Sequence, residues 1–395
     1  MQLNRYKFIV NRFLNIILGF LPGLMYSLFN IRDDRIYIFS SEFNTEFNHN
    51  SKSLFLYFLK KRQDIQCRFV INDEGKRNAL INEYGDFFIS SHSIYGIFYI
   101  LKAKVWITSS LETPIGGVFL NRNRIVIHLG HGAPLKNVGL SESKTSIIKY
   151  LYYKIIKTNF SYFFSTSEHF NKNWKECLGV DWNNVVIAGQ ARNDLITTND
   201  LVDFNHLLDA RKTNILYAPT WRPYSKTILF PFSDFELKKF NNFLIKNEML
   251  VYLRLHPNFE GDELDLIQSA SNIRLLERAN IDDINTVLGS FDLLITDYSS
   301  IYVDYLLTKR PVLFLPYDYS EYNETVGFSI DYFNYTPGPK PENFKAFMQE
   351  LTDLINIDSY YYEQRVRVNN ILNTVQSEHC KNNATLISEL CRKDL

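Results

Sequence analysis

The feature that most constrains the fold of this chain is an alternation, repeated twice along its length, of short β-branched or aromatic runs with longer helical patterns. Parallel strands need a crossover between them, usually a helix, so this alternation is typical of parallel sheets covered by helices. The 395 residues suffice for two domains at the usual ~100–200 residues each. We therefore predict the α/β class, with two doubly wound domains.

The predicted strands fall into two series. The first occupies residues 35–40, 67–72, 104–108, 124–129, 162–165 and 185–188, with helices near 51–62, 91–101 and 146–156. The second occupies residues 214–218, 250–255, 273–276, 293–296 and 312–315, with helices near 234–247, 283–290 and 300–307. Ligands of open α/β domains bind outside the carboxyl ends of the strands, so we expect the chemistry in a cleft that both sheets share.

These series set the expected domain boundaries. We predict an N-terminal segment at residues 1–32, a first Rossmann-like domain at 33–200, a second at 201–375 and a terminal helix at 376–395. No glycine or proline follows Pro341, so we expect a helical end that docks back across the domains.

Composition excludes several classes of protein. Hydrophobic residues make up 46% of the chain and charged residues 22%, which argues against a disordered or multi-span membrane protein. The 43 basic and 43 acidic side chains cancel, which argues against a nucleic-acid partner. The four cysteines form no CxxC pair, so neither a zinc site nor a disulfide framework is predicted, and a reducing cytoplasm fits best.

The first 32 residues favour a membrane surface. They contain no acidic residue, and Arg5, Lys7, Arg12 and Arg32 surround the apolar run 13–29. That run is short against the ~20 apolar residues of a membrane-spanning helix, and no small-x-small cleavage site follows it. We predict a partly inserted helix on an anionic membrane; the alternative is a first helix that packs on the following domain.

A glycine-flanked histidine is the first candidate for chemistry. His131 follows a predicted strand within the sequence Gly-His-Gly-Ala-Pro-Leu-Lys, where a glycine backbone allows close approach to a ligand. An imidazole suits proton transfer near neutral pH, so His131 is a candidate general base. The alternative is a turn whose histidine caps a helix. Lys136 could meet a phosphate or stay solvated, and His128 is predicted to belong to the core or to support the site.

A second histidine ends a strand of the second domain. His256 precedes Pro257, which stops the strand and turns the chain away at the carboxyl edge of the sheet. We predict that its imidazole faces the cleft, the alternative being a hydrogen-bonded histidine that merely finishes the strand.

A hydroxyl-rich turn in the second domain predicts a phosphate site. Thr296, Asp297, Ser299 and Ser300 lie between an apolar strand and a helix, where unpaired N–H groups meet the positive end of the helix dipole. Ser299 or Asp297 also suits a helix cap. Neither a Walker A sequence nor a Gly-x-Gly-x-x-Gly after a strand is present, which argues against an ATPase or a simple dinucleotide enzyme.

Two arginines are further candidates for phosphate contacts. Arg222 follows the first strand of the second domain, next to Trp221, which could stack on a base or a sugar or belong to the core. Arg310 follows the helix after the hydroxyl-rich turn. Either arginine could equally be structural.

Taken in order, these motifs resemble those of the CDP-glycerol glycerophosphotransferase family, the teichoic-acid primases and polymerases and their relatives in capsule synthesis. The resemblance runs from about residue 35 to residue 339 and rests on GHGAPLK, GQARND, LYAPTWR, RLHPN and ITDYSSIYVDYLLTKRPVLFLPYD. The family pattern has tryptophan and threonine where this chain has Gly130 and Ala133, and proline where it has Ala191.

The resemblance implies a GT-B fold, with the acceptor at the N-terminal domain and the nucleotide donor held by the C-terminal one, and peripheral attachment to the inner face of the cytoplasmic membrane. It implies His131 as base, His256 as phosphate ligand, and a phosphate-binding hydroxyl on Ser299 or Ser300. A hydroxyl of a lipid-linked saccharide or polyol-phosphate chain would attack the phosphorus that carries glycerol in CDP-glycerol, and CMP would leave.

No cofactor is expected, and no metal site is evident, because Asp282, Asp283, Asp292 and Asp297 form no DxD after a strand of the first domain. Three other functions stay open: the same fold acting on CDP-ribitol or a nucleotide sugar, a hydrolysing UDP-sugar epimerase, and a catalytically silent membrane scaffold for polymer assembly.

Overall fold

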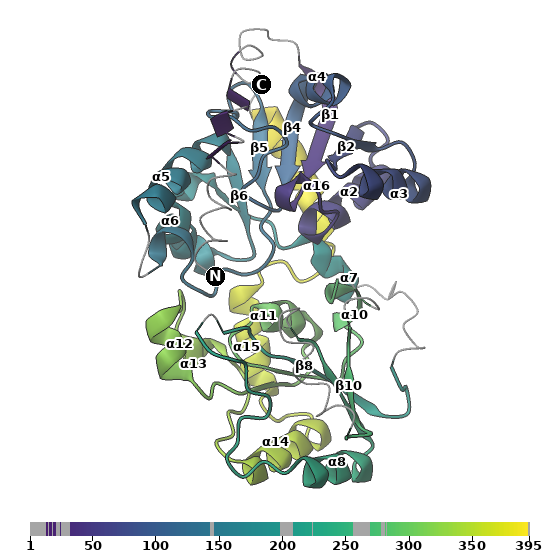
Figure 1. The fold of residues 1–395 in the computed structure, drawn as a ribbon, viewed down its shortest axis with the longest axis vertical. Coiled ribbons are helices and arrows are strands. Elements are labelled where there is room, and N and C mark those ends of the chain that lie inside the picture. Colours follow the sequence, from purple (N-terminus) through teal and green to yellow (C-terminus); the bar gives the residue numbers. More distant parts are fainter. Residues whose placement is uncertain are drawn as a thin grey trace. The chain divides into compact units, whose positions relative to one another are not determined.

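The computed structural model describes residues 13–14, 16–17, 19–20, 24, 32–142, 146–197, 208–222, 224–255, 269–277, 281 and 283–393. Its chain forms two compact units (Figure 1). Unit 1 contains Met1–Asp194 and Thr374–Leu395, and unit 2 contains Leu195–Asn373. The chain thus passes from unit 1 to unit 2 a few residues before the predicted boundary at 200. The terminal helix, which was predicted as a separate element, belongs to unit 1.

Unit 1 is built on a seven-stranded parallel sheet. Its strands are β1 (Asp33–Ser40), β2 (Gln66–Val70), β3 (Phe88–Ile89), β4 (Ala103–Thr108), β5 (Ile125–His128), β6 (Tyr162–Ser165) and β7 (Val185–Ile187). They follow the order β3-β2-β1-β4-β5-β6-β7, and every pair is parallel. This is a Rossmann-type order, in which the direction of winding reverses between β1 and β4.

Helices connect these strands. They are α2 (His49–Lys61), α3 (Glu74–Tyr84), α4 (Ile94–Lys102), α5 (Ile147–Ile156) and α6 (Asn171–Leu178), with short 3₁₀ turns that include η1 (Glu42–Asn44) and η4 (Glu168–Phe170). After β7 come the turn η6 (Ala191–Asn193) and the short helix α7 (Asp194–Thr197), at which the chain passes into unit 2, and α16 (His379–Lys393) returns to unit 1. The strands β4, β5 and β6 are buried along nearly their whole length, as expected for a sheet with helices on its faces, whereas the edge strand β7 is half-buried.

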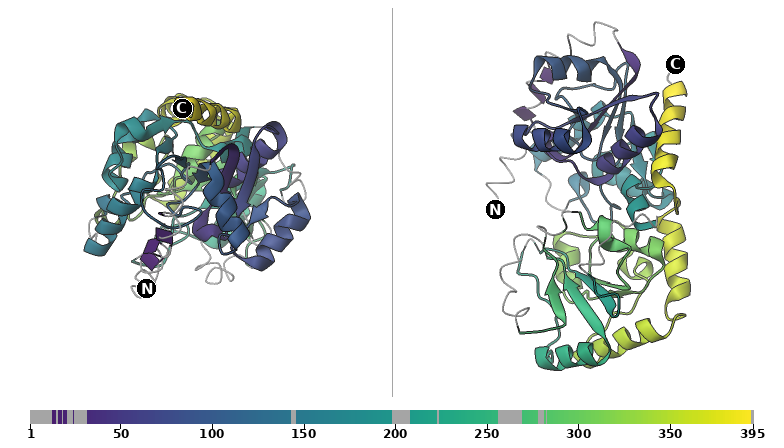
Figure 2. Two further views of the ribbon diagram at one scale, coloured as in Figure 1. Left: turned by 90° about the horizontal axis from the view of Figure 1, so that it is seen from above. Right: turned by 90° about the vertical axis from the view of Figure 1, so that its right-hand side faces the viewer.

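The core of unit 1 is largely aromatic and is completed by the last helix. Phe39, Phe55 and Phe69 pack edge to face at 5.4 Å between ring centroids. From α16, Ala384 and Ile387 enter the same cluster. Figure 2 shows α16, in yellow, running along the purple and blue elements of unit 1. The first strand β1 and the last helix α16 thus share one hydrophobic core.

Unit 2 repeats the scheme with five parallel strands. They are β8 (Thr213–Ala218), β9 (Met249–Leu253), β10 (Ile273–Leu275), β11 (Leu293–Thr296) and β12 (Val312–Phe314), in the order β10-β9-β8-β11-β12. Its helices are α8 (Leu237–Lys246), α10 (Asn285–Leu288), α11 (Ile301–Tyr305), α12 (Tyr319–Thr325), α13 (Tyr332–Tyr335), α14 (Phe344–Asn356) and α15 (Tyr362–Leu372). Phe240 of α8 and Phe347 of α14 pack against the sheet in one cluster, and the winding reverses between β8 and β11.

The described part of the N-terminal segment is mostly helical. The helical residues are Phe13, Leu14, Ile16, Ile17, Gly19, Phe20 and Leu24, and Arg32, just before β1, is not helical. Phe13 packs on Tyr152 of α5 at 5.8 Å between ring centroids, while Leu14, Ile17 and Phe20 are exposed. No helix among the described residues has the length and apolar character needed to cross a membrane.

Candidate functional site

Several candidate residues of each unit lie where its sheet reverses its winding. In unit 1 the loops after β1, β4 and β5 meet at the carboxyl edge, and in unit 2 the loops after β8, β11 and β12 do the same. Crevices at such reversal points are where open α/β sheets bind ligands.

His131 occupies the loop after β5 in unit 1. The preceding Gly130 has φ 69°, a left-handed conformation that glycine adopts without the cost of a Cβ atom. The Nδ1 atom of His131 lies 3.2 Å from the carbonyl oxygen of Ser109, the residue after β4. A carbonyl can only accept, so the neutral imidazole carries its proton on Nδ1 and leaves a lone pair on Nε2. This tautomer is the one that a general base needs.

The start of α2 fixes the loop that carries His131. The side-chain amide of Asn50 donates to the carbonyl of Gly130 at 2.9 Å, and its oxygen accepts the backbone N–H of Arg192 at 3.1 Å. The hydroxyls of Ser51 and Ser109 lie 2.7 Å apart. All these bonds are buried. Sequence reasoning missed Asn50 and Ser51; two buried polar residues at a helix start are the signal that could have found them.

A second histidine and a carboxylate flank His131. The ring centroids of His49 and His131 lie 5.4 Å apart, and Nε2 of His49 lies 3.7 Å from a carboxylate oxygen of Glu42. His131 is exposed, yet the protein around it displaces part of its hydration, which lowers its pKa; His49 lowers the pKa further, whereas the Ser109 carbonyl and Glu42 act in the opposite direction. Sequence reasoning missed His49 and Glu42.

His128 belongs to the core, one of the two positions proposed for it. Its ring packs against Phe160, Phe163 and Trp174, and burial together with His131 lowers the pKa of His128 to about 3. A Cβ atom on residue 130 would meet the Trp174 indole at 3.8 Å, so the space beside Gly130 adjoins an aromatic wall. Lys136 lies half-buried further along the same loop.

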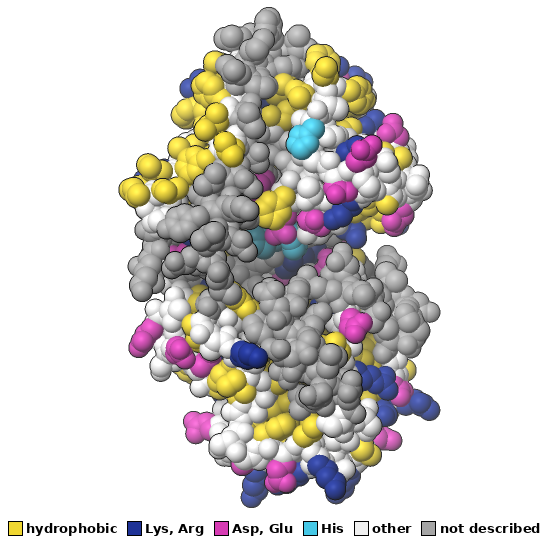
Figure 3. Space-filling model, viewed as in Figure 1, with side chains coloured by type: hydrophobic (Ala, Val, Ile, Leu, Met, Phe, Trp, Pro, Cys, Tyr) yellow, Lys and Arg dark blue, Asp and Glu magenta, His cyan; other side chains and the backbone are white. Residues whose placement is uncertain are grey.

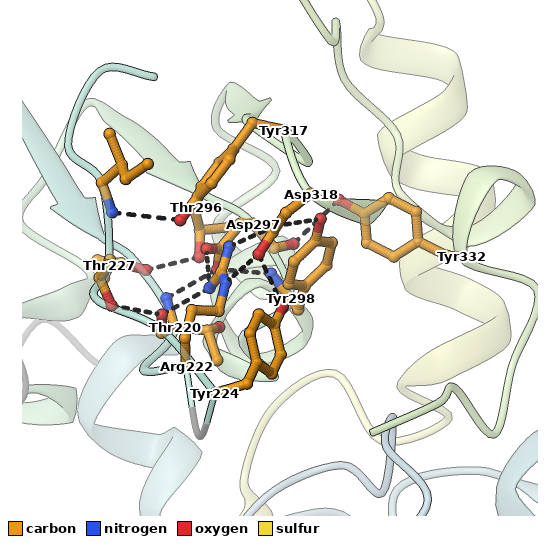
Figure 4. A network of polar contacts seen from close by, with 12 residues as sticks. Thr220, Arg222, Tyr224, Thr227, Thr296, Asp297, Tyr298, Tyr317, Asp318 and Tyr332 are labelled. Atoms are coloured by element: carbon orange, nitrogen blue, oxygen red, sulfur yellow. Dashed lines mark hydrogen bonds and ion pairs between the residues drawn. The ribbon is translucent and has the colours of Figure 1, made fainter. Parts of the chain in front are cut away.

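In unit 2 the predicted phosphate turn is held by buried polar contacts (Figure 4). The Thr296 hydroxyl donates to the Ala218 carbonyl at 2.7 Å and is fully buried. One carboxylate oxygen of Asp297 accepts the backbone N–H groups of Thr220 and Tyr298 at 2.8 and 2.6 Å. Both side chains therefore join the loops after β8 and β11.

Arg222 lies behind the turn and is fully buried. Its Nη1 atom donates to Asp297 at 2.7 Å, its Nε and Nη2 atoms donate to Asp318 at 2.7 and 2.9 Å, and Nη1 also reaches the Thr220 carbonyl at 2.6 Å. The guanidinium is thus used within the protein. The structure corrects the expected phosphate contact of Arg222: this side chain supports the loops that carry the turn.

Asp318, in the loop after β12, completes this network. Burial alone would raise the pKa of Asp318, but hydrogen bonds from Arg222 and Tyr224 outweigh it and lower the pKa. The Tyr298 hydroxyl donates to the same carboxylate at 3.0 Å. Asp318 was missed as a site residue, although it ends the longest motif of the sequence.

The two serines of the turn remain half-exposed. The Ser299 hydroxyl accepts the backbone N–H of Ile301 at 3.4 Å, and the Ser300 side chain makes no capping hydrogen bond to α11. These two hydroxyls keep hydrogen-bonding capacity at the carboxyl edge of the sheet.

Arg310 lies at the other edge of the sheet. It precedes β12, and its Nη1 atom donates to the carbonyls of Gly289 and Phe291 at 2.8 and 2.7 Å, both of which precede β11. Because the strands are parallel, this is the amino edge, opposite the Thr296–Ser300 turn. The structure therefore corrects the expectation that Arg310 contacts the same phosphate.

Two predicted residues, His256 and Asp282, lie outside the described residues. Strand β9 ends three positions before His256. Trp221 is half-buried. Within the part of the chain that the structure describes, no three His, Cys, Asp or Glu side chains are grouped so that they could hold a metal ion.

The chain is similar to a known protein family and to characterised relatives. The sequence model of the CDP-glycerol:poly(glycerophosphate) glycerophosphotransferase family matches residues 24–385. A teichoic acid poly(glycerol phosphate) polymerase of Bacillus spizizenii is 25% identical over 364 residues, which cover 85% of this chain and 86% of that protein. A teichoic acid glycerol-phosphate transferase of Staphylococcus aureus is 24% identical over 347 residues, covering 83% and 86%.

A ribitol relative matches as well. The teichoic acid poly(ribitol-phosphate) polymerase of Bacillus spizizenii is 23% identical over 375 residues, which cover 90% of this chain but only 56% of that protein. The chain thus spans little more than half the length of this relative.

Two solved structures show the same fold. The wall teichoic acid polymerase TagF aligns with a TM-score of 0.72 at 20% identity, over 100% of this chain and 98% of that one. A UDP-GlcNAc 2-epimerase of Neisseria meningitidis aligns with a TM-score of 0.53 at 14% identity, over 90% and 99%.

Proposed function

We propose a function from the premise that this chain belongs to the CDP-glycerol:poly(glycerophosphate) glycerophosphotransferase family. It transfers glycerol phosphate from CDP-glycerol to a hydroxyl of a teichoic-acid-type or capsule-type polymer acceptor and releases CMP. The observation that carries the proposal is His131, fixed in the Nδ1–H tautomer by Ser109 at the winding reversal of unit 1.

The reaction is a displacement at phosphorus. Nε2 of His131 accepts the proton of the acceptor hydroxyl as its oxygen bonds to the phosphorus that carries glycerol. The bond between that phosphorus and the bridging oxygen of the pyrophosphate breaks, and CMP takes the electron pair. A positioned base of this kind typically contributes ~10²–10⁴-fold to the rate.

Donor binding is assigned to unit 2. Ser299 and Ser300 offer hydroxyls beside the first N–H groups of α11, which suits the oxygens of a phosphate. Asp297, Arg222 and Asp318 hold this turn from behind. His256 remains the predicted second phosphate ligand. No cofactor is assigned, and a divalent ion is not part of the proposal.

Within this function, two polyols are candidates for the group that the donor carries, glycerol and ribitol. The matched relatives are named for glycerol phosphate and for ribitol phosphate, so CDP-ribitol is the second candidate donor. The test is CMP release by the full chain offered CDP-glycerol, CDP-ribitol and UDP-GlcNAc in turn, with a synthetic lipid-linked acceptor.

We expect CMP from CDP-glycerol and none from CDP-ribitol. CMP from CDP-ribitol alone would move the protein to the sister activity, and the absence of CMP with both CDP donors would contradict the proposed function. Release of UDP from UDP-GlcNAc would favour a sugar transferase. His131→Ala serves as the control for a contaminating hydrolase.

The proposed place of action is the inner face of the cytoplasmic membrane, where a lipid-linked acceptor lies. Its support is a set of exposed apolar side chains on unit 1 (Figure 3). On α4 they are Ile94, Tyr95 and Phe98, and on α5 they are Ile147, Ile148, Tyr150 and Leu151. Lys154 and Lys149, the latter paired with Glu142, lie on the same α5, which has no acidic residue. An apolar face with basic neighbours suits anionic lipid.

Replacing Ile147 and Leu151 with serine should weaken binding to vesicles of anionic phospholipid. Burial of each such side chain in lipid contributes ~1.5–3 kcal/mol, so we expect at least a tenfold loss in co-sedimentation affinity. Ile245→Ser on α8, an equally exposed apolar position of unit 2, is the matched control and should bind as the unaltered chain does. Unchanged binding of the double variant would contradict this role of α5.

A further inference from the structure

Three titratable side chains from separate segments meet at the winding reversal of unit 1. Glu42 follows β1, His49 begins α2, and His131 follows β5. His49 lies between the other two, with its Nε2 3.7 Å from the Glu42 carboxylate and its ring 5.4 Å from the His131 ring. The parallel order of the sheet brings them together across more than 80 positions of sequence.

His49 holds this place at some conformational cost. Its φ is 56°, in the left-handed region that non-glycine residues rarely adopt. The Asn50 and Ser51 bonds to the loops of His131 and Ser109 fix the helix start at this point. The side chains of His49 and Glu42 keep 25% and 39% of their surface exposed, so burial in a core does not explain their arrangement.

Two imidazoles this close cannot both be protonated without repulsion. A proton on either ring therefore disfavours a proton on the other. The Glu42 carboxylate lies beside His49, so a positive charge on His49 has an opposite charge next to it. Two other groups act on the protonation of His131. The charge of Arg192 disfavours a proton on His131, whereas the Ser109 carbonyl favours one. The neighbouring His128 is buried.

We propose that His49, backed by Glu42, is a positioning residue that holds a positive charge beside His131 and keeps His131 in the neutral form that can act as base. This inference rests on the proposed function for its catalytic consequence, but the proton distribution itself is a property of the free protein. The acceptor hydroxyl then meets an unprotonated Nε2 at and below neutral pH.

The first test reads the proton directly, without substrate. The full chain, labelled with ¹³C and ¹⁵N in histidine, is titrated by NMR at low ionic strength, and the His131 signals are assigned by their loss in His131→Asn. His49→Asn removes the second imidazole with a residue that tolerates a left-handed backbone. We expect the midpoint of the His131 titration to rise by about one pH unit.

The second test reads the same change in catalysis. The acid limb of the kcat/KM profile for CMP release should move to higher pH by a similar amount in His49→Asn, with the rate on the alkaline plateau retained. His49→Arg, which keeps a positive charge beside His131, should leave the limb at or below its original position. His92→Asn, an exposed histidine of the same unit, is the matched control and should change neither reading.

The outcomes distinguish a failure of the role proposed for His49 from a failure of the proposed function. A His131 midpoint that stays in place in His49→Asn, with an unchanged thermal unfolding midpoint to exclude misfolding, would overturn the proposal. A chain that releases no CMP from any donor would contradict the proposed function and leave the NMR result to decide the proton distribution alone. A uniform loss of rate at every pH, with the His131 midpoint unmoved, would reduce His49 to a structural role.

Discussion

Replacing His131 with asparagine should lower the turnover rate of CMP release by ~10²–10⁴-fold and leave the affinity for the donor nearly unchanged. The asparagine amide can still donate to the Ser109 carbonyl, as Nδ1–H does in the unaltered protein. What it lacks is the nitrogen lone pair that accepts the proton of the acceptor hydroxyl. The measurement is steady-state CMP release together with CDP-glycerol binding by calorimetry.

The variant thus separates the base from the bond that orients it. His131→Ala removes both and should be at least as slow. His169→Asn, at a half-buried histidine of the short η4 turn in the same unit, should retain full rate. Equal losses in donor affinity and in turnover would contradict the role of His131 as base, because a group that acts only in the transition state does not hold the ground-state donor.

Replacing Arg222 with methionine should destabilise unit 2 by about 3–5 kcal/mol, the usual cost of removing one partner from a buried ion pair. Methionine fills much of the volume, but the carboxylates of Asp297 and Asp318 lose their common partner. We expect faster hydrogen exchange of the β8 and β11 amides in the full chain, followed peptide by peptide. The β1 and β4 amides of unit 1 should exchange at their original rates.

An exposed arginine of the same unit gives the matched control. Arg211 pairs with Asp209 at 3.2 Å, but its side chain is 88% exposed, so Arg211→Met should cause no measurable change. Equal protection of β8 in the Arg222→Met and Arg211→Met variants would contradict the supporting role that the structure gives Arg222.

The same network predicts that the stability of unit 2 falls in acid. The pKa of Asp318 is lowered in the folded protein, so the unfolded chain binds its proton more readily. The stability from this carboxylate is therefore present above the ordinary aspartate pKa of ~3.9 and is lost as the pH falls through the lowered value. Asp318→Asn should remove this part of the acid sensitivity of unit 2.

Much of the fold could be predicted from the sequence. Short apolar runs such as 162–165 and 293–296 coincide with β6 and β11, because buried parallel strands must be continuously apolar. The strand β3 has only two residues and gives no such signal. The helical chain end was also recognised, but its division into α14, α15 and α16, and the return of α16 to unit 1, depend on tertiary packing.

The site was predicted unevenly for physical reasons. A glycine-flanked histidine shortly after a strand is a local pattern, so the sequence singles out His131 as a candidate. The partners of Arg222 lie 75 and 96 positions away, and only the folded chain shows that they use its donors. Arg310 precedes a parallel strand, and topology alone could have placed it at the amino edge. His49 reaches His131 only because β4 and β5 lie beside β1 in that order.

The return of the chain to unit 1 has a consequence for biosynthesis. Unit 2 is an insertion between Asp194 and Thr374, and the core begun by β1 is closed by Ala384 and Ile387 of α16. All of unit 2 therefore leaves the ribosome before unit 1 can bury its last apolar surface, which meanwhile stays open to chaperones and aggregation. A premature stop within α16 would damage unit 1, whose sheet is encoded earlier, and spare unit 2, which is encoded nearer to the stop.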